Sequence, residues 1–179
     1  SAGHVTCGVG AGSPGNVNIP AGFHCNLGPL LFGDFVAASN SGHTVGINPA
    51  PFTRWDAPTA TAFINFEVAP QQQVGTVKLT YSVTGNQIGA DLNLNTYSGN
   101  PSITETVCLT QPNQAGACPA GSAVNLFVQG AGPTTDQKFF QAAGKVWVSK
   151  DIQIVQGSTL SDFTNSNHVP EPVSLMLMG

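Results

Sequence analysis

The stretch 77–94, VKLTYSVTGNQIGADLNL, has the clearest periodicity in the chain. In residues 77–83 the odd positions are apolar and the even positions polar, which is the period of a strand with one buried face. Residues 84–87, TGNQ, are typical of a turn. Apolar side chains then return at every second position: Ile88, Ala90, Leu92 and Leu94. The stretch therefore predicts a β-hairpin.

The same alternation recurs along the chain. It is clear in residues 60–68, 103–109, 124–128 and 145–155, and weaker in 4–9 and 30–37. Helical periodicity is limited to residues 136–143, about two turns before Gly144. Short strands separated by turn signals predict an all-β fold, an antiparallel β-sandwich or jelly roll in a single domain.

The sequence suggests three regions. Residues 1–59 are rich in Gly, Asn and Pro and are expected to form a loop-rich N-terminal arm. Residues 60–163 carry the alternating segments and are expected to form the sandwich core. Residues 164–179 are interpreted as a polar linker and tail.

Low charge is the main anomaly of the composition. Only 8% of the residues are charged, against about 25% in a typical soluble protein. Five Lys and Arg residues are too few for the basic surface that a nucleic-acid-binding protein needs. No apolar run reaches the roughly 20 residues that span a bilayer. Ser, Thr, Asn and Gln supply most of the polar surface.

The four cysteines form two pairs of near neighbours, Cys7 with Cys25 and Cys108 with Cys118. An even number in such a chain favours disulfides and an oxidising compartment. We therefore expect an exported protein from which a signal peptide preceding Ser1 has been removed.

No constellation of residues predicts catalysis, and we expect no catalytic residue, metal or cofactor. Glu67, Asp91 and Glu105 are interpreted as outward-facing strand positions rather than as paired acids of a glycosidase. His4, Cys7, His24 and Cys25 include zinc-ligand types, but a disulfide is favoured there. The aspartates are too scattered to predict a calcium site. A secreted hydrolase remains a minor alternative.

Aromatic side chains could bind a sugar ring. Trp55, in the segment Thr53-Arg54-Trp55-Asp56, is the best candidate for an exposed ring. Trp147 and Tyr81 are interpreted as core or sheet-face residues.

The end of the chain carries a short motif, Val169-Pro170-Glu171-Pro172, followed by small and aliphatic residues. It resembles the PEP-CTERM sorting signal of bacterial exosortase substrates, and the resemblance covers roughly residues 145–179. The resemblance implies export in a Gram-negative-type bacterium, sorting at the cell envelope with only transient membrane contact, and a place at the surface or in the biofilm matrix.

Two functions are consistent with these features. The first is a structural protein of the surface or matrix that assembles with copies of itself into a filament, through edge strands, the N-terminal arm or the tail. In the tail, Val173, Leu175 and Leu177 could add a strand to the sheet of a neighbouring copy. The alternative is an adhesive, carbohydrate-binding module that acts on exopolysaccharide through Trp55.

Overall fold

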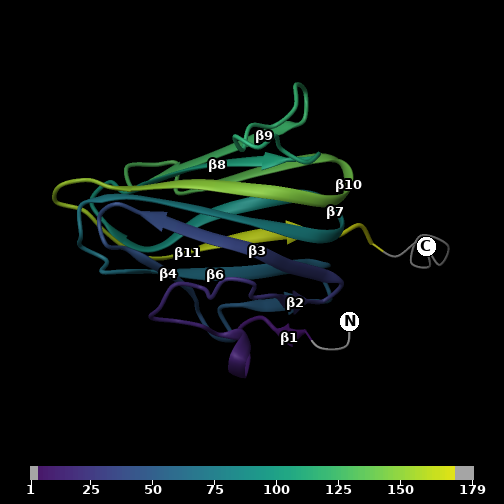
Figure 1. Cartoon of the computed structure of the whole chain (residues 1–179), viewed down its shortest axis with the longest axis horizontal. Helices are drawn as coiled ribbons and strands as arrows, with labels where there is room; N and C mark the ends of the chain where they lie inside the picture. Colours follow the sequence, from purple (N-terminus) through teal and green to yellow (C-terminus); the bar gives the residue numbers. More distant parts are fainter. Residues whose placement is uncertain (1–3, 172–179) are drawn as a thin grey trace.

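The computed structural model describes residues 4–171, and in this part the chain is all-β (Figure 1). Eleven strands and one short 3-10 helix, η1 (Gly10–Gly12), make up the regular structure of the described residues. The strands are β1 (Val5–Thr6), β2 (Cys25–Leu27), β3 (Leu30–Ser39), β4 (Thr44–Ile47), β5 (Arg54–Asp56), β6 (Thr61–Ala69), β7 (Gly75–Ser98), β8 (Ser102–Cys108), β9 (Ala123–Gln129), β10 (Thr135–Ile154) and β11 (Thr159–His168).

Two long strands, β7 and β10, run through both layers of the fold. Residues 75–84 of β7 pair with β3 and with residues 145–154 of β10, whereas residues 89–98 pair mainly with β11. The hairpin predicted at residues 84–87 is therefore wrong, because the strand bends there instead of reversing. Gly85, at φ 131°, is a residue type that tolerates such a conformation. The buried positions change from odd to even across this bend.

The bends curl one continuous sheet into two packed layers. The first layer contains β1, β2, β3, β8, β9 and the halves of β7 and β10 that pair with each other at residues 75–84 and 145–154. The second layer contains β4, β5, β6, β11 and the other halves of β7 and β10. Apart from the β1–β2 pair, the strand pairs are antiparallel. The predicted sandwich class is confirmed.

Aromatic rings from both layers meet in the core. Tyr81 of the first layer lies 5.4 Å from Phe66 of the second, measured between ring centroids. Phe66 in turn lies 5.3 Å from Phe163. The inner faces of the two layers thus bury one hydrophobic core, as in other face-to-face sheets.

The sequence-based boundaries differ from the observed elements at three places. Much of the region 1–59 joins the sheet as β2–β5, and β11 continues to His168, past the boundary expected after residue 163. Residues 136–143 belong to β10 rather than to a helix. Pairing with β7 gives this segment a strand conformation, which shows how tertiary contacts outweigh a weak local pattern.

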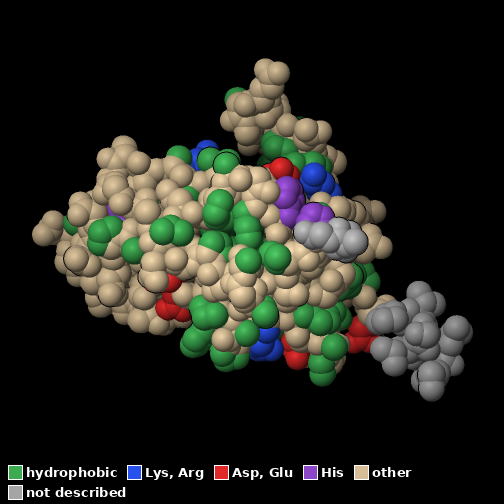
Figure 2. Space-filling model, turned by 60° about the horizontal axis from the view of Figure 1, so that its bottom comes forward, with side chains coloured by type: hydrophobic (Ala, Val, Ile, Leu, Met, Phe, Trp, Pro, Cys, Tyr) green, Lys and Arg blue, Asp and Glu red, His purple; other side chains and the backbone are tan. Residues whose placement is uncertain are grey.

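The surface follows the composition. On the face shown in Figure 2, uncharged polar and backbone atoms predominate, and charged groups are few. Within residues 4–171, the chain contains no helix with the length and apolar character needed to cross a membrane.

Candidate functional site

The outer face of the first layer carries a groove made of two adjoining hollows, which share Lys78. One hollow, of about 300 Å³, lies between the sheet and the loop that follows β8. The other, of about 660 Å³, continues over β3, β7, β8 and β10. Hydroxyl, amide and charged side chains line this second hollow, including Ser39, Asn40, Thr104, Asp151 and Gln153.

Two aromatic residues line the smaller hollow, the buried Tyr81 and Trp147. The neighbours of Trp147 in β10, Val146 and Val148, are buried in the core, so the alternation of the strand directs Trp147 to the outer face. The Trp147 side chain is half-buried. Lys145 lies on the same face, with Nζ 5.2 Å from the centre of the Trp147 ring. Trp147 is thus a sheet-face residue with part of its surface open to the groove.

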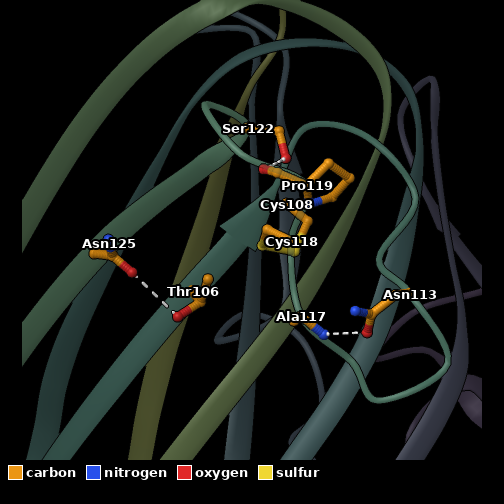
Figure 3. The surroundings of a disulfide bond; sticks show 8 residues. All are labelled: Thr106, Cys108, Asn113, Ala117, Cys118, Pro119, Ser122 and Asn125. Atoms are coloured by element: carbon orange, nitrogen blue, oxygen red, sulfur yellow. Dashed lines mark hydrogen bonds between the residues drawn. A yellow bond between two sulfur atoms is a disulfide. The ribbon is translucent and has the colours of Figure 1, made fainter.

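The loop 109–122 forms a wall of the smaller hollow, through Pro112, Gln114, Ala115 and Gly116. Its anchor is the Cys108–Cys118 disulfide (Figure 3). Cys108 is the cross-strand partner of Trp147, so the disulfide lies beside the tryptophan.

Hydrogen bonds hold the conformation of this loop. The side-chain Oδ1 of Asn113 accepts from the backbone N–H groups of Ala115, at 3.0 Å, and Ala117, at 2.9 Å. The Leu109 N–H donates to the Ser122 carbonyl at 2.9 Å, which closes the base of the loop. Hydrogen bonds therefore hold the loop at its base and at its tip.

Removing the Cys108–Cys118 disulfide should make the loop 109–122 more mobile and the protein less stable. For the double variant Cys108→Ser, Cys118→Ser, we expect the free energy of unfolding to fall by about 2–3 kcal/mol, since the bond closes a short loop in the unfolded chain. Chemical denaturation of the variant and the wild type measures this loss. A variant as stable as the wild type would show that the hydrogen bonds alone fix the loop.

Charges in the groove are balanced. Beside Trp147, the Lys145 ammonium lies 3.9 Å from the Asp34 carboxylate, which accepts a hydrogen bond of 2.6 Å from Ser82. Asp34 lies at an irregularity in the pairing of β3 with β7. Lys78 and Asp151 add one charge of each sign to the larger hollow. This balance suits an uncharged ligand with many hydroxyl groups.

The structure places Trp55 outside this groove. Trp55 lies in β5 and is half-buried, and its ring packs over Gly28, where a Cβ would collide with it. It does not line either hollow. Its role as a sugar contact stays a prediction.

Both expected disulfides are present, Cys7–Cys25 and Cys108–Cys118. At the other end of the described chain, the Val169 N–H donates to the Ala60 carbonyl at 2.9 Å, and Pro170 and Glu171 follow it. The remaining residue of the motif, Pro172, and the tail residues Val173, Leu175 and Leu177 lie outside the described residues.

Neither hollow of the groove is lined by the candidate acids Glu67, Asp91 and Glu105 or by a histidine. Glu67 faces its cross-strand partner Asp162 in a separate hollow of about 250 Å³. The Asp91 carboxylate oxygen Oδ2 lies 2.9 Å from Nε2 of His168, within hydrogen-bond distance. Within residues 4–171, no three His, Cys, Asp or Glu side chains are grouped as metal ligands would be.

The interpretation of Glu105 as an outward-facing residue is wrong. Glu105 is fully buried and forms an ion pair with Lys150, its cross-strand partner, which is also fully buried. Burial lowers the pKa of Lys150 well below its usual value, and burial raises the pKa of the neighbouring Tyr81. The sequence could have indicated this burial, because Glu105 lies on the same side of its strand as the buried Ile103 and Val107.

The sequence matches no family model. Comparison with curated proteins also finds no match. Among solved structures, the chain is similar to TmCBM61 in complex with β-1,4-galactotriose, with a TM-score of 0.36 and 10% sequence identity, over 75% of this chain and 84% of that one. A similarity of this size carries no argument about function.

Proposed function

We propose that the protein is an exported carbohydrate-binding module that holds a polysaccharide chain in the groove on its first layer. The observation that carries this proposal is the position of Trp147, half-buried on the outer face of β10 beside a disulfide-anchored loop. No catalytic role is part of the proposal.

The chemistry of the groove fits a sugar polymer. A tryptophan ring offers a large apolar face with little conformational freedom to lose, and the C–H groups of a pyranose can pack on it. Around the ring, Asp34 and Gln114 offer polar groups to sugar hydroxyls, and Asp151 and Gln153 do so further along the groove. Because the floor consists of paired strands, these groups are held in place before a ligand binds.

Export is part of the same proposal. Two disulfides are typical of proteins in an oxidising compartment, and the Val169–Pro172 motif resembles a PEP-CTERM sorting signal. An exopolysaccharide of the cell surface or biofilm matrix is therefore the ligand class that we propose.

Affinity electrophoresis through gels that contain neutral or acidic polysaccharides tests this function. Ser149→Arg should restore free mobility, because Ser149 lies two residues from Trp147 on the same strand face and lines the smaller hollow. Asn93→Arg is the matched control, since Asn93 is half-buried on β7 in the second layer. Retardation of the wild type and of Asn93→Arg alone supports the proposal, whereas equal mobility of all three proteins in every gel contradicts it.

Self-assembly into a filament is a second candidate. The observation in its favour is the edge strand β9, which pairs with β8 and presents the exposed side chain of Phe127. Electron microscopy of the secreted protein and of a variant lacking residues 172–179 tests it. The truncation starts after Glu171, which leaves β11 and the Val169–Ala60 hydrogen bond intact. Filaments lost on truncation would assign assembly to the tail, and dispersed particles in both samples would contradict assembly.

A further inference from the structure

Three side chains that could react with one another meet in the core between the two layers. Lys150 of β10 lies next to Glu105 of β8 in the first layer. Asn165 of β11 faces them from the second layer, with Oδ1 2.8 Å from the Lys150 Nζ. All three residues are fully buried. Neither the groove nor the proposed function uses them.

The surroundings favour a neutral amine over an ammonium ion. The Lys150 Nζ lies 5.7 Å from the centre of the Tyr81 ring and 5.9 Å from that of Phe163. A buried ion pair loses much of its hydration, and its charges are costly in such an apolar site. Transfer of one proton from the Lys150 ammonium to the Glu105 carboxylate removes both charges and leaves a nucleophilic amine beside the Asn165 amide.

We propose that Lys150 and Asn165 become joined by an amide bond between their side chains, with Glu105 as the catalytic proton carrier. This inference does not depend on the proposed carbohydrate binding. It assigns to the core a self-catalysed modification that covalently links the two layers.

The reaction balances without any other reactant. The lone pair of the Lys150 Nζ attacks Cγ of Asn165, and the N–Cγ bond forms. Glu105 gives its proton to the departing Asn165 nitrogen and takes one from the Lys150 nitrogen. The Cγ–Nδ2 bond breaks, one molecule of ammonia leaves, and Glu105 ends in its starting state.

Several features of the site favour this reaction over the unreacted contact. The reacting groups are already in hydrogen-bond contact, and such positioning is equivalent to a very high effective concentration, about 10⁵–10⁸ M in well-oriented cases. Loss of ammonia to solvent and the exclusion of water from the core both oppose the reverse reaction. The Glu105 Oε2, buried and without a hydrogen-bond partner, is free to carry the second proton.

Neighbouring amides orient the Asn165 side chain. Asn165 Nδ2 donates to Asn167 Oδ1 at 2.9 Å, and Asn167 Nδ2 donates to Gln87 Oε1 at 2.9 Å. Gln87 is itself fixed by a 3.0 Å bond from Nε2 to the Val83 carbonyl, at the bend of β7. Asn167 and Gln87 are therefore positioning residues, and they hold the amide nitrogen that leaves.

Mass spectrometry of the intact, reduced protein tests the bond. We expect the wild type to be lighter than its sequence by one molecule of ammonia. Trypsin should then cut after Lys145 but not after Lys150, whose side chain has become an amide. The product is one peptide that starts at Val146 and contains Asn165, lighter than its sequence by the same amount. Cleavage at Lys145 serves as the internal control.

Two variants separate the reaction from the fold. Glu105→Gln should keep the shape of the site and remain unlinked, with the full mass and normal cleavage after Lys150. Asn165→Ala should also remain unlinked, while it keeps the Lys150–Glu105 pair. The mass of the wild type shows whether the Lys150–Asn165 bond is present even if both variants fail to fold.

Two results would overturn the inference. The first is folded wild-type protein, with both disulfides formed, that keeps its full mass and is cut after Lys150. The second is an ammonia loss that maps to a peptide without Asn165. Glu105→Gln protein that links as fully as the wild type would overturn the role of Glu105.

Discussion

Replacing Lys150 with methionine should lower the free energy of unfolding by about 3–5 kcal/mol, because it leaves the buried Glu105 carboxyl group without its partner. That is a large part of the roughly 5–15 kcal/mol by which a typical domain is stable. Methionine has nearly the length of the lysine stem, so the loss arises from the unpartnered carboxyl group and from the missing link to Asn165 rather than from a cavity. Denaturation by urea, followed by circular dichroism, measures it.

A second substitution identifies the cause. In Lys150→Met, Glu105→Leu the unpartnered carboxyl group is gone, and we expect this protein to be more stable than Lys150→Met alone. Both proteins lack the Lys150–Asn165 bond, so their difference in stability reports the cost of the buried carboxyl group. Lys145→Met is the matched control, since Lys145 is partly exposed on the same strand and should cost no more than about 1 kcal/mol. Equal instability of the single and double variants would contradict this account of Glu105.

Replacing Trp147 with alanine should weaken polysaccharide binding by about 2 kcal/mol, roughly 30-fold in Kd, as loss of a central aromatic residue does at other binding sites. The fold should survive, because Trp147 lies on the outer face and the core residues Val146 and Val148 remain. Affinity electrophoresis over a range of ligand concentrations gives the Kd, and the melting temperature shows whether the protein is folded.

Phe139→Ala is the control for this variant. Phe139 is 63% exposed and belongs to the half of β10 in the second layer, so its loss removes an exposed aromatic ring outside the groove. We expect its Kd to equal that of the wild type. If Phe139→Ala weakens binding and Trp147→Ala does not, the ligand binds on the other layer.

The alternation of apolar residues was sufficient to predict the sandwich class and most of the longer strands, but not β2, β4, β5 or β11. It could not predict how they connect at residues 84–87, because the same Gly-containing segment suits a tight turn or a bend in one long strand. The outcome depends on pairing with β3, β10 and β11, which are distant in sequence. For a related reason the sequence did not indicate that β11 extends past residue 163, since the polar end of this strand is held by its partners β6 and β7.

Part of the candidate site could be predicted from the sequence. Trp147 alternates with Val146 and Val148, so its outward direction could be read from the period of the strand. Lys150 continues the series of buried positions Val146, Val148, Ile152 and Ile154, and a charged residue in such a series indicates a buried partner. Sequence alone could not identify that partner or bring Asn165 to it, because these contacts arise from sheet register and from the packing of the two layers.

The most direct measurement of the central claim uses the fluorescence of Trp147 in a Trp55→Phe variant. The sequence contains two tryptophans, so this variant has Trp147 as its sole tryptophan, and its emission reports on the groove. We expect the emission to change, and the change to saturate, as a polysaccharide that retards the wild type is added. Two results together would contradict the assignment of the groove. In the first, the Trp55→Phe variant still binds but its Trp147 emission does not change. In the second, the emission of Trp55 in a Trp147→Phe variant changes and saturates, which would place the ligand at Trp55.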